Sequence, residues 1–265
     1  MSEQSSKNSK PKPIQWSKYL KEFLMLFLAI SLGFWVENQR QDGEDRRVEK
    51  EYMMSLLDEL AEDSLKLVDA IRNNQIKMGG FDSLLTALEQ PLPYTDSTLH
   101  LVYYLQRRYA GSNQSVTLSE RTLKQLVATG GYRLIQNRQI VSEIAHYQER
   151  IDRLNSQSHT MIYDFQVRAR VISVGLFHAR HYHGLTRESA RRLLDPSLPL
   201  KPLDGSPKEI NAYANWLNTT NGAFFYYGVQ MEELLHRLAQ LMAHIENEYQ
   251  ILHPNARPDR LNSKI

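Results

Sequence analysis

The feature that most limits what this chain can fold into is a long apolar stretch near its start. Residues 16–40 read WSKYLKEFLMLFLAISLGFWVENQR. The uninterrupted apolar run extends from Phe23 to Val36, which is 14 residues. Taken alone, this length suits the core of a signal peptide or a buried helix better than a membrane span. The flanking residues therefore have to decide among a cleaved signal, a membrane anchor and a buried helix.

The flanks favour a membrane anchor. Trp16 and Trp35 are 19 residues apart, and in a helix this separation is about 28 Å, close to the thickness of the hydrocarbon core of a bilayer. Tyr19 and Trp35 would then lie at opposite interfaces as aromatic anchors. Lys18 and Lys21 can bury their methylene groups and extend their ammonium groups back to the lipid headgroups.

The two alternatives fit this stretch less well. A signal peptide should have small residues directly after its apolar core. Ala29-Ile30-Ser31 offers a weak cleavage site, but the apolar run continues past it to Val36. A soluble core helix stays open as an alternative because the run is short. We favour a flexible basic N-terminus over residues 1–17 and a transmembrane helix over residues 18–36.

Basic residues near the ends of the span predict its orientation. Acidic residues count for little in this rule, so only lysines and arginines are compared. Five precede the middle of the span and four follow it: Lys7, Lys10, Lys12, Lys18 and Lys21 against Arg40, Arg46, Arg47 and Lys50. This small bias predicts a cytoplasmic N-terminus, with the rest of the chain outside the cytoplasm.

Two features inside the span are candidates for function. Ala29 and Gly33 place two small residues on one helix face, which lets a second helix approach closely. Glu22 lies one turn inside the first interface. A carboxylate within lipid is by default a functional group, but a position this close to the edge favours the headgroup region, beside Lys18 and Lys21.

The remaining sequence has a marked charge pattern. Residues 37–100 carry 14 Asp and Glu against 7 Lys and Arg, whereas residues 101–200 carry 7 against 14. Such opposite imbalances suggest an acidic segment that packs beside a basic one, with recruitment of an outside acidic partner as the alternative. The net charge of +2 gives no general attraction to nucleic acid. The absence of cysteine excludes disulfides and thiolate metal sites.

Apolar residues recur at helical spacing after the span, and no segment alternates as a strand would. We predict an all-α fold, a single N-terminal transmembrane helix followed by a multi-helix bundle with long antiparallel helices over residues 37–252. The first amphipathic helix should end at Gly79-Gly80, and Ser206-Pro207-Lys208-Glu209 is typical of a capped helix start. Prolines predict a loop or linker over 195–207, and residues 253–265 should form a disordered tail. The other helices are expected at about 81–88, 95–110, 117–129, 134–154 and 160–182.

Two Glu-x-x-His motifs are the strongest sign of an enzyme. Di-iron bundles use two such motifs, with two further glutamates, and all of these side chains point into the core. At about 100° per residue, His146 lies on the far side of the apolar face of its helix. Glu233 and His236 lie opposite the apolar face of theirs. We therefore predict that these motifs, including Glu143, are solvated, and that the chain has no cofactor and no enzymatic activity.

Two further patterns are weaker candidates. His178, His181 and His183 form a dense cluster, but spacings of three and two do not place all three imidazoles on one helix face, and carboxylate companions are missing. Surface histidines are favoured over a metal or pH-sensing site. Residues 119–145 are compatible with a helix-turn-helix. A bundle needs this shape merely to pack, and a domain outside the cytoplasm never meets DNA, so we expect no nucleic-acid partner.

Several motifs together resemble a family of bacterial proteins of unknown function. They are a lysine-flanked span with Glu22 near its start, LAISLG within it, EKEYMMSLLDELAEDSLKL, TLKQLVATGGYRLIQNRQIVSEIAHYQERID and a closing HIENEYQ. The Gly-Gly turn followed by LIQN is the most distinctive of these. The resemblance implies one N-terminal transmembrane helix followed by a helical domain, and it assigns no activity to any residue.

The sequence thus predicts a single-pass protein of the bacterial inner membrane. Its favoured function is non-enzymatic: a scaffold or protein-interaction module outside the cytoplasm. Expected partners are membrane lipid and either a second copy of the chain or another membrane protein. The alternative is a membrane-tethered sensor, a helical bundle that binds a ligand near the histidine cluster.

Overall fold

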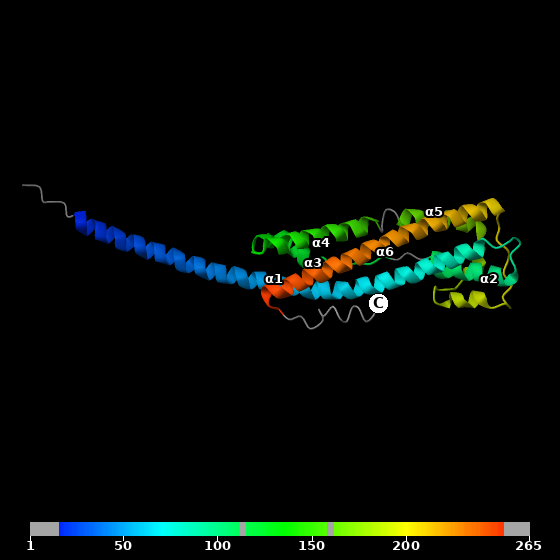
Figure 1. Cartoon of the computed structure of the whole chain (residues 1–265), viewed down its shortest axis with the longest axis horizontal. Helices are drawn as coiled ribbons and strands as arrows, with labels where there is room; N and C mark the ends of the chain where they lie inside the picture. The colour runs from blue at the N-terminus through cyan, green and yellow to red at the C-terminus, as the bar shows by residue number, and fades with distance from the viewer. Residues whose placement is uncertain (1–15, 112–114, 158–161, 252–265) are drawn as a thin grey trace, which may run out of the picture. The chain divides into compact units, whose positions relative to one another are not determined.

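The computed structural model describes residues 16–111, 115–157 and 162–251. Every regular element in these ranges is a helix, and they contain no strand, so the predicted all-α fold is confirmed (Figure 1). The chain divides into two compact units, Met1–Lys50 and Glu51–Ile265. Of the predicted flexible N-terminus 1–17, residues 1–15 lie outside the described residues, as does the predicted tail 253–265, and residues 16 and 17 belong to the first helix.

Helix α1 (Trp16–Leu88) contributes residues to both units. The second unit contains the last part of α1 and all other elements. In chain order these are α2 (Asp96–Leu105), the π-helix η1 (Gln106–Ala110), α3 (Arg121–Thr129), the 3₁₀ helix η2 (Gly131–Arg133), α4 (Arg138–Gln157), α5 (Tyr163–Leu176), the 3₁₀ helices η4 (Ala179–Tyr182) and η5 (Ser189–Leu194), and α6 (Pro207–Tyr249).

Helix α6 is the long element against which α4 and α5 pack, and Figure 1 shows all three side by side. Two hydrogen bonds join it to α1: Asn74 Nδ2 donates to the Phe224 carbonyl oxygen (2.9 Å), and Asn221 Nδ2 donates to Asp82 Oδ1 (2.7 Å). Later residues of α1 meet earlier residues of α6, so these two helices are antiparallel.

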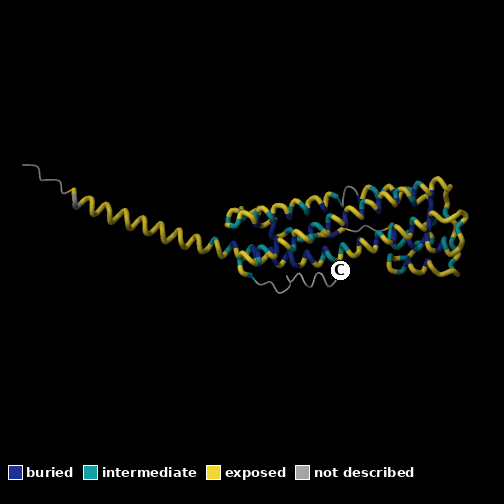
Figure 2. The backbone as a smooth tube through the Cα atoms, viewed as in Figure 1, coloured by how far each residue is buried: buried dark blue, intermediate teal, exposed yellow. Residues whose placement is uncertain are grey.

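The core lies along the inner faces of these helices (Figure 2). It begins at Met53 and includes side chains from every long helix of the second unit, such as Leu60, Ile144, Phe224 and Leu238. Their spacing of three, four or seven residues is what the sequence shows, because a helix brings such positions onto one face. Burial of these apolar side chains is therefore the main force that holds the bundle together.

The prediction that the first amphipathic helix ends at Gly79-Gly80 is wrong. Helix α1 continues through both glycines to Leu88. A Cβ atom at Gly80 would lie 2.2 Å from Cγ of Tyr109, whereas one at Gly79 would meet nothing within 4 Å. Gly80 is therefore a packing site for the Tyr109 ring and not a helix stop.

Other helix ends agree with the sequence only in part. Ser206 and Glu209 form the predicted capping box at the start of α6, and residues 195–206 form no helix, as the prolines predicted. Thr95 caps α2 through the Thr98 amide. In contrast, α5 ends at Leu176 and not near Tyr182, because Phe177 adopts an extended conformation. Helix α3 begins at Arg121, four residues later than expected.

The start of α3 is held by two carboxylates of α1. Glu59 accepts hydrogen bonds from the Thr122 amide (3.1 Å) and the Thr122 hydroxyl (2.9 Å), and from Arg121 Nε (3.0 Å). One turn later, Asp63 accepts two from the Ser119 amide, at 3.0 and 2.9 Å. A helix N-terminus has unpaired amides, and here α1 supplies the cap that α3 lacks in its own sequence. The acidic and basic segments therefore do meet, at the Glu59–Arg121 ion pair.

The pKa values of these two carboxylates shift in opposite directions. Burial is the largest influence on each and favours the protonated form of both. For Glu59, the hydrogen bonds from Thr122 and Arg121 outweigh burial, and its pKa is lowered. For Asp63, which is more deeply buried and also bonded by Tyr147, burial prevails and its pKa is raised. Of the two carboxylates, Glu59 is thus the one whose charged form is favoured by its bonds to the start of α3.

Candidate functional site

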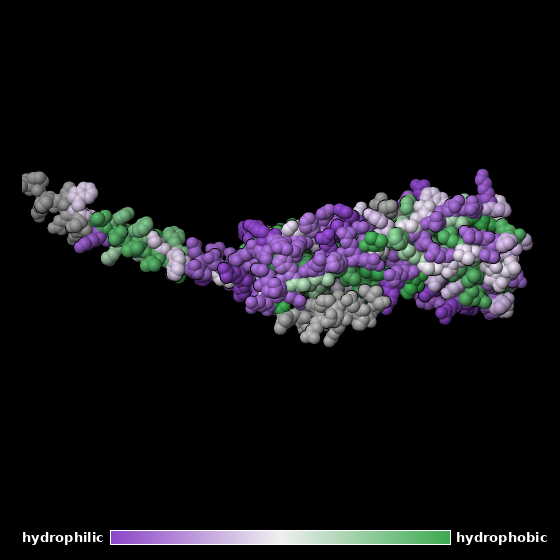
Figure 3. Space-filling model, viewed as in Figure 1, coloured by the Kyte–Doolittle hydropathy of each residue, from purple (hydrophilic) through white to green (hydrophobic). Residues whose placement is uncertain are grey.

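The apolar stretch of α1 is exposed along its whole length. In the part of the chain that the structure describes, one helix is long and apolar enough to cross a membrane, with an 18-residue window of mean hydropathy 1.6, none of which is buried. Figure 3 shows hydrophobic side chains gathered on these first turns. Exposed apolar surface of this extent is unfavourable in water, and it marks a site of contact with lipid or another protein.

The predicted anchor residues lie on this exposed helix. Trp16, Tyr19 and Trp35 are 76%, 62% and 61% exposed, and Lys21 and Glu22 are exposed as well. The side chain of Lys18 lies outside the described part of the structure. Ala29 is exposed, and a Cβ atom at Gly33 would meet nothing within 4 Å. The surface around these two small residues is therefore open to a second helix.

The three clustered histidines do not converge on one point. His178 Nε2 lies 3.1 Å from the Pro202 carbonyl oxygen, and His181 Nε2 accepts a hydrogen bond from the Lys201 amide (3.1 Å). His183 is exposed. Burial, with smaller contributions from His178 and Lys201, lowers the pKa of His181, which favours its neutral form. Two of these side chains thus fasten the proline-containing loop to η4.

The two Glu-x-x-His motifs differ from the prediction in one respect. His146 and His236 are exposed, as expected, but both glutamates are only half-exposed and bond across the α4–α6 interface. Glu143 Oε2 lies 2.9 Å from His244 Nδ1, and Glu233 Oε2 accepts from Arg150 Nη1 at 2.7 Å. Among the described residues no three metal-ligating side chains come together. The motifs therefore tie two helices to each other.

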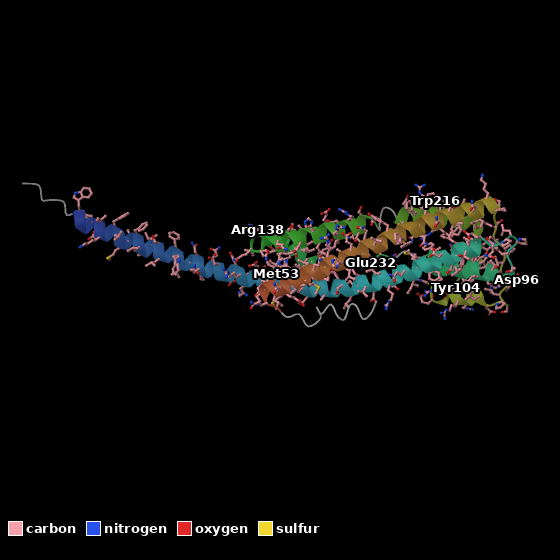
Figure 4. The ribbon with its side chains drawn as sticks, viewed as in Figure 1. Met53, Asp96, Tyr104, Arg138, Trp216 and Glu232 are labelled. Carbon is pink, nitrogen blue, oxygen red and sulfur yellow. The ribbon has the colours of Figure 1, made fainter. Side chains whose placement is uncertain are left out.

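A groove of about 420 Å³ lies between α4 and α6. Its floor contains Tyr147 and Leu241, which are both 2% exposed. The tyrosine hydroxyl donates to Asp63 (3.3 Å), so the phenol oxygen is already paired. Polar side chains form the walls: Gln139, Glu143 and His146 from α4, and Arg237, Gln240 and His244 from α6. Figure 4 shows the two helices with their side chains, with Arg138 labelled at the start of α4 and Glu232 on α6.

The sequence analysis missed a buried lysine. Lys77 is fully buried on α1, with its Nζ atom 4.4 Å from the centre of the Phe224 ring and 5.8 Å from that of Phe81. Burial, together with the nearby charge of Arg187, lowers the pKa of Lys77 to about 7. The sequence signal was its position around the helix. Lys77 shares a helix face with Asn74 and Phe81, which are both buried.

The segment that is compatible with a helix-turn-helix packs against α1 at its glycine turn. Gly130 joins α3 to η2 with a positive φ of 66°, which favours glycine. A Cβ atom at Gly131 would lie 2.9 Å from Leu126 Cδ2 and 3.4 Å from Tyr52 of α1. The Gly-Gly pair therefore lets this turn lie close to α1.

Comparison of the chain with protein-family models, with curated proteins and with solved structures gives no match.

Proposed function

We propose that this chain is a single-pass membrane protein whose helical domain is an interaction module outside the cytoplasm. The observation that carries the proposal is the exposure of the 18-residue apolar window of α1. A helix that belonged to a soluble core would bury that window against other helices. Lipid is the environment in which this surface is stable, and Trp16, Tyr19 and Trp35 have the places expected of interfacial anchors.

The same helix also argues against a cleaved signal. Helix α1 passes through Ala29-Ile30-Ser31 without interruption and continues to Leu88. Cleavage there would cut within α1, the helix that also holds the start of α3 through Glu59. A membrane stem that continues directly into the domain suits tethering, since the stem and the docking helix are one element. The resemblance to bacterial proteins with one N-terminal span supports the inner membrane as the location.

Orientation is proposed from the basic residues alone, with the N-terminus in the cytoplasm. The chain has no cysteine, so single cysteines can report on it directly. We would introduce Ser5→Cys or Ser142→Cys, the latter at an exposed position on α4, and label intact cells with a membrane-impermeant thiol reagent. Labelling at position 142 alone is expected. Labelling at position 5 alone would reverse the orientation, and a protein that fractionates as soluble would end the anchor proposal.

Self-association through the span is the proposed basis of scaffolding. Small residues at Ala29 and Gly33 permit close approach of two helices. Gly33→Leu should lower the dimer fraction in mild detergent, measured by chemical crosslinking. Gly43→Leu is the matched control, because a Cβ atom there also meets nothing within 4 Å but the position follows the span. An unchanged dimer fraction in Gly33→Leu, or an equal loss in both variants, would place the contact elsewhere.

A membrane-tethered sensor remains the second candidate function. The observation that favours it is the polar groove between α4 and α6, and not the histidine cluster, of which His178 and His181 hold the loop after η5. A groove of about 420 Å³ falls within the size range of small-molecule sites.

A further inference from the structure

We infer that the groove between α4 and α6 binds a small carboxylate with an apolar body. This inference goes beyond the interaction module proposed above and does not depend on how the chain is anchored. It follows from a contrast among the side chains that line the groove: the carboxylate is paired, and several donors are not.

The acceptor in the groove is already paired. Glu143 Oε2 lies 2.9 Å from His244 Nδ1, and Glu143 Oε1 accepts a hydrogen bond from Gln139 Nε2 at 3.0 Å. Its negative charge is thus met by an imidazole and an amide that lie beside it. A ligand that entered the groove would gain little by offering a donor to this carboxylate.

Three other side chains that line the groove and carry hydrogen-bond donors are, in contrast, not used. Arg237 has a carboxylate neighbour, Glu233, but at 3.8 Å this contact is longer than a hydrogen bond. His146 is likewise 3.9 Å from Glu149. Within the described residues, the side chains of Arg237, His146 and Gln240 make no hydrogen bond. They lie on both walls, so an anion between the walls would be bound from two sides.

The shape of the groove selects the class of anion. A planar guanidinium matches a carboxylate through two parallel hydrogen bonds. Below the polar walls, the Tyr147 ring and Leu241 form an apolar floor, which suits a flat or aliphatic body attached to that carboxylate. A small, fully hydrated anion would leave this floor unused.

Calorimetric titration of the full chain in detergent tests the inference with three probes: sodium benzoate, sodium hexanoate and inorganic phosphate. Benzoate or hexanoate should bind, and phosphate should bind at least tenfold more weakly. Arg237→Gln should weaken carboxylate binding at least tenfold, and His146→Gln should weaken it by a smaller factor. Arg72→Gln, which removes an exposed arginine paired with Asp69 on α1, should leave it unchanged.

Circular dichroism of each variant would show whether the bundle is intact, so that a loss of binding is read only from folded protein. Failure of the wild-type chain to bind either carboxylate would overturn the inference. Equal binding of phosphate, or equal weakening in Arg72→Gln, would overturn it as well, since neither is compatible with recognition by Arg237 over an apolar floor. None of these outcomes bears on the membrane anchor, which the cysteine-labelling experiment tests separately.

Discussion

Lys77 is the residue whose place in the core is least expected from its chemistry. It has no exposed surface, its Nζ atom lies near the rings of Phe81 and Phe224, and its pKa falls to about 7 from an ordinary value near 10.5. The unfolded chain therefore binds a proton at this group over a pH range in which the folded chain does not. The stability of the fold should rise with pH between about 7 and 10 because of this single group.

Lys77→Met tests this pH dependence. Methionine fills a similar volume without a charge, so the variant should be more stable than the wild type at pH 7. The difference in unfolding temperature should shrink as the pH rises toward 10, since the free-energy cost of removing the proton that the unfolded lysine carries falls as the pH approaches its ordinary pKa near 10.5. Thermal unfolding at several pH values, followed by circular dichroism, would measure it. A difference that stays constant with pH would contradict the assigned cause.

Gly80 and Gly79 show at the same scale why a sequence motif can mislead. The pair is typical of a helix end, yet α1 continues through it because Gly80 packs under Tyr109. Gly80→Ala should destabilise the fold by about 1–3 kcal/mol through overpacking. Gly79→Ala, at an exposed helical position, should stabilise it by about 0.5–1 kcal/mol. Chemical denaturation would compare the two, and a stabilised Gly80→Ala would mean that Tyr109 moves away at little cost.

At the scale of elements, the cap that α1 supplies to α3 joins segments distant in sequence through several hydrogen bonds to one carboxylate. Glu59→Ala should cost about 2–3 kcal/mol, because it leaves the Thr122 amide and hydroxyl unpaired in a buried place. Hydrogen exchange at Thr122 and Leu123 should accelerate in this variant. Glu62→Ala is the control, since Glu62 is 60% exposed and forms a surface ion pair with Lys66, and it should change stability by less than about 0.5 kcal/mol.

The Glu59 cap also sets a pH dependence, of the same sign as that of Lys77 but in the acid range. The pKa of Glu59 is lowered in the fold, so its contribution is complete above the ordinary glutamate pKa. It is lost as the pH falls through the folded value. The wild type should therefore lose stability relative to Glu59→Gln below about pH 4.5, where the two side chains become alike. Unfolding temperatures of the two proteins that stay equally far apart from pH 7 to pH 3 would contradict this.

The contrast between elements shows which parts of the fold a sequence can predict. Helical periodicity, the Ser206–Glu209 capping box and the proline loop are local, and the structure has all three. The cap of α3 is not local, because Glu59 and Thr122 are 63 residues apart. Likewise, Glu143 has the motif of a metal ligand, and only the fold shows His244 beside it. The roles of these residues depend on contacts between helices, and a single sequence does not show which helices touch.

At the scale of the whole molecule, apolar surface is divided between the two units. The buried hydrophobic core begins at Met53, and residues 19–36 are all exposed. The second unit therefore has a core of its own, and the first has apolar surface that water does not favour. This division predicts that residues 16–50 make the chain require detergent and that the remaining residues fold without them.

A truncation series tests this division. A fragment of residues 51–265 should stay in solution without detergent and unfold cooperatively, with helical circular dichroism like that of the second unit in the full chain. A fragment of residues 16–265, which retains the span, should still require detergent and serves as the control. Aggregation of the shorter fragment in plain buffer would show that the first unit contributes to the fold itself. Solubility of the longer fragment would instead remove the reason for placing α1 in a membrane, because its exposed apolar window would then be stable in water.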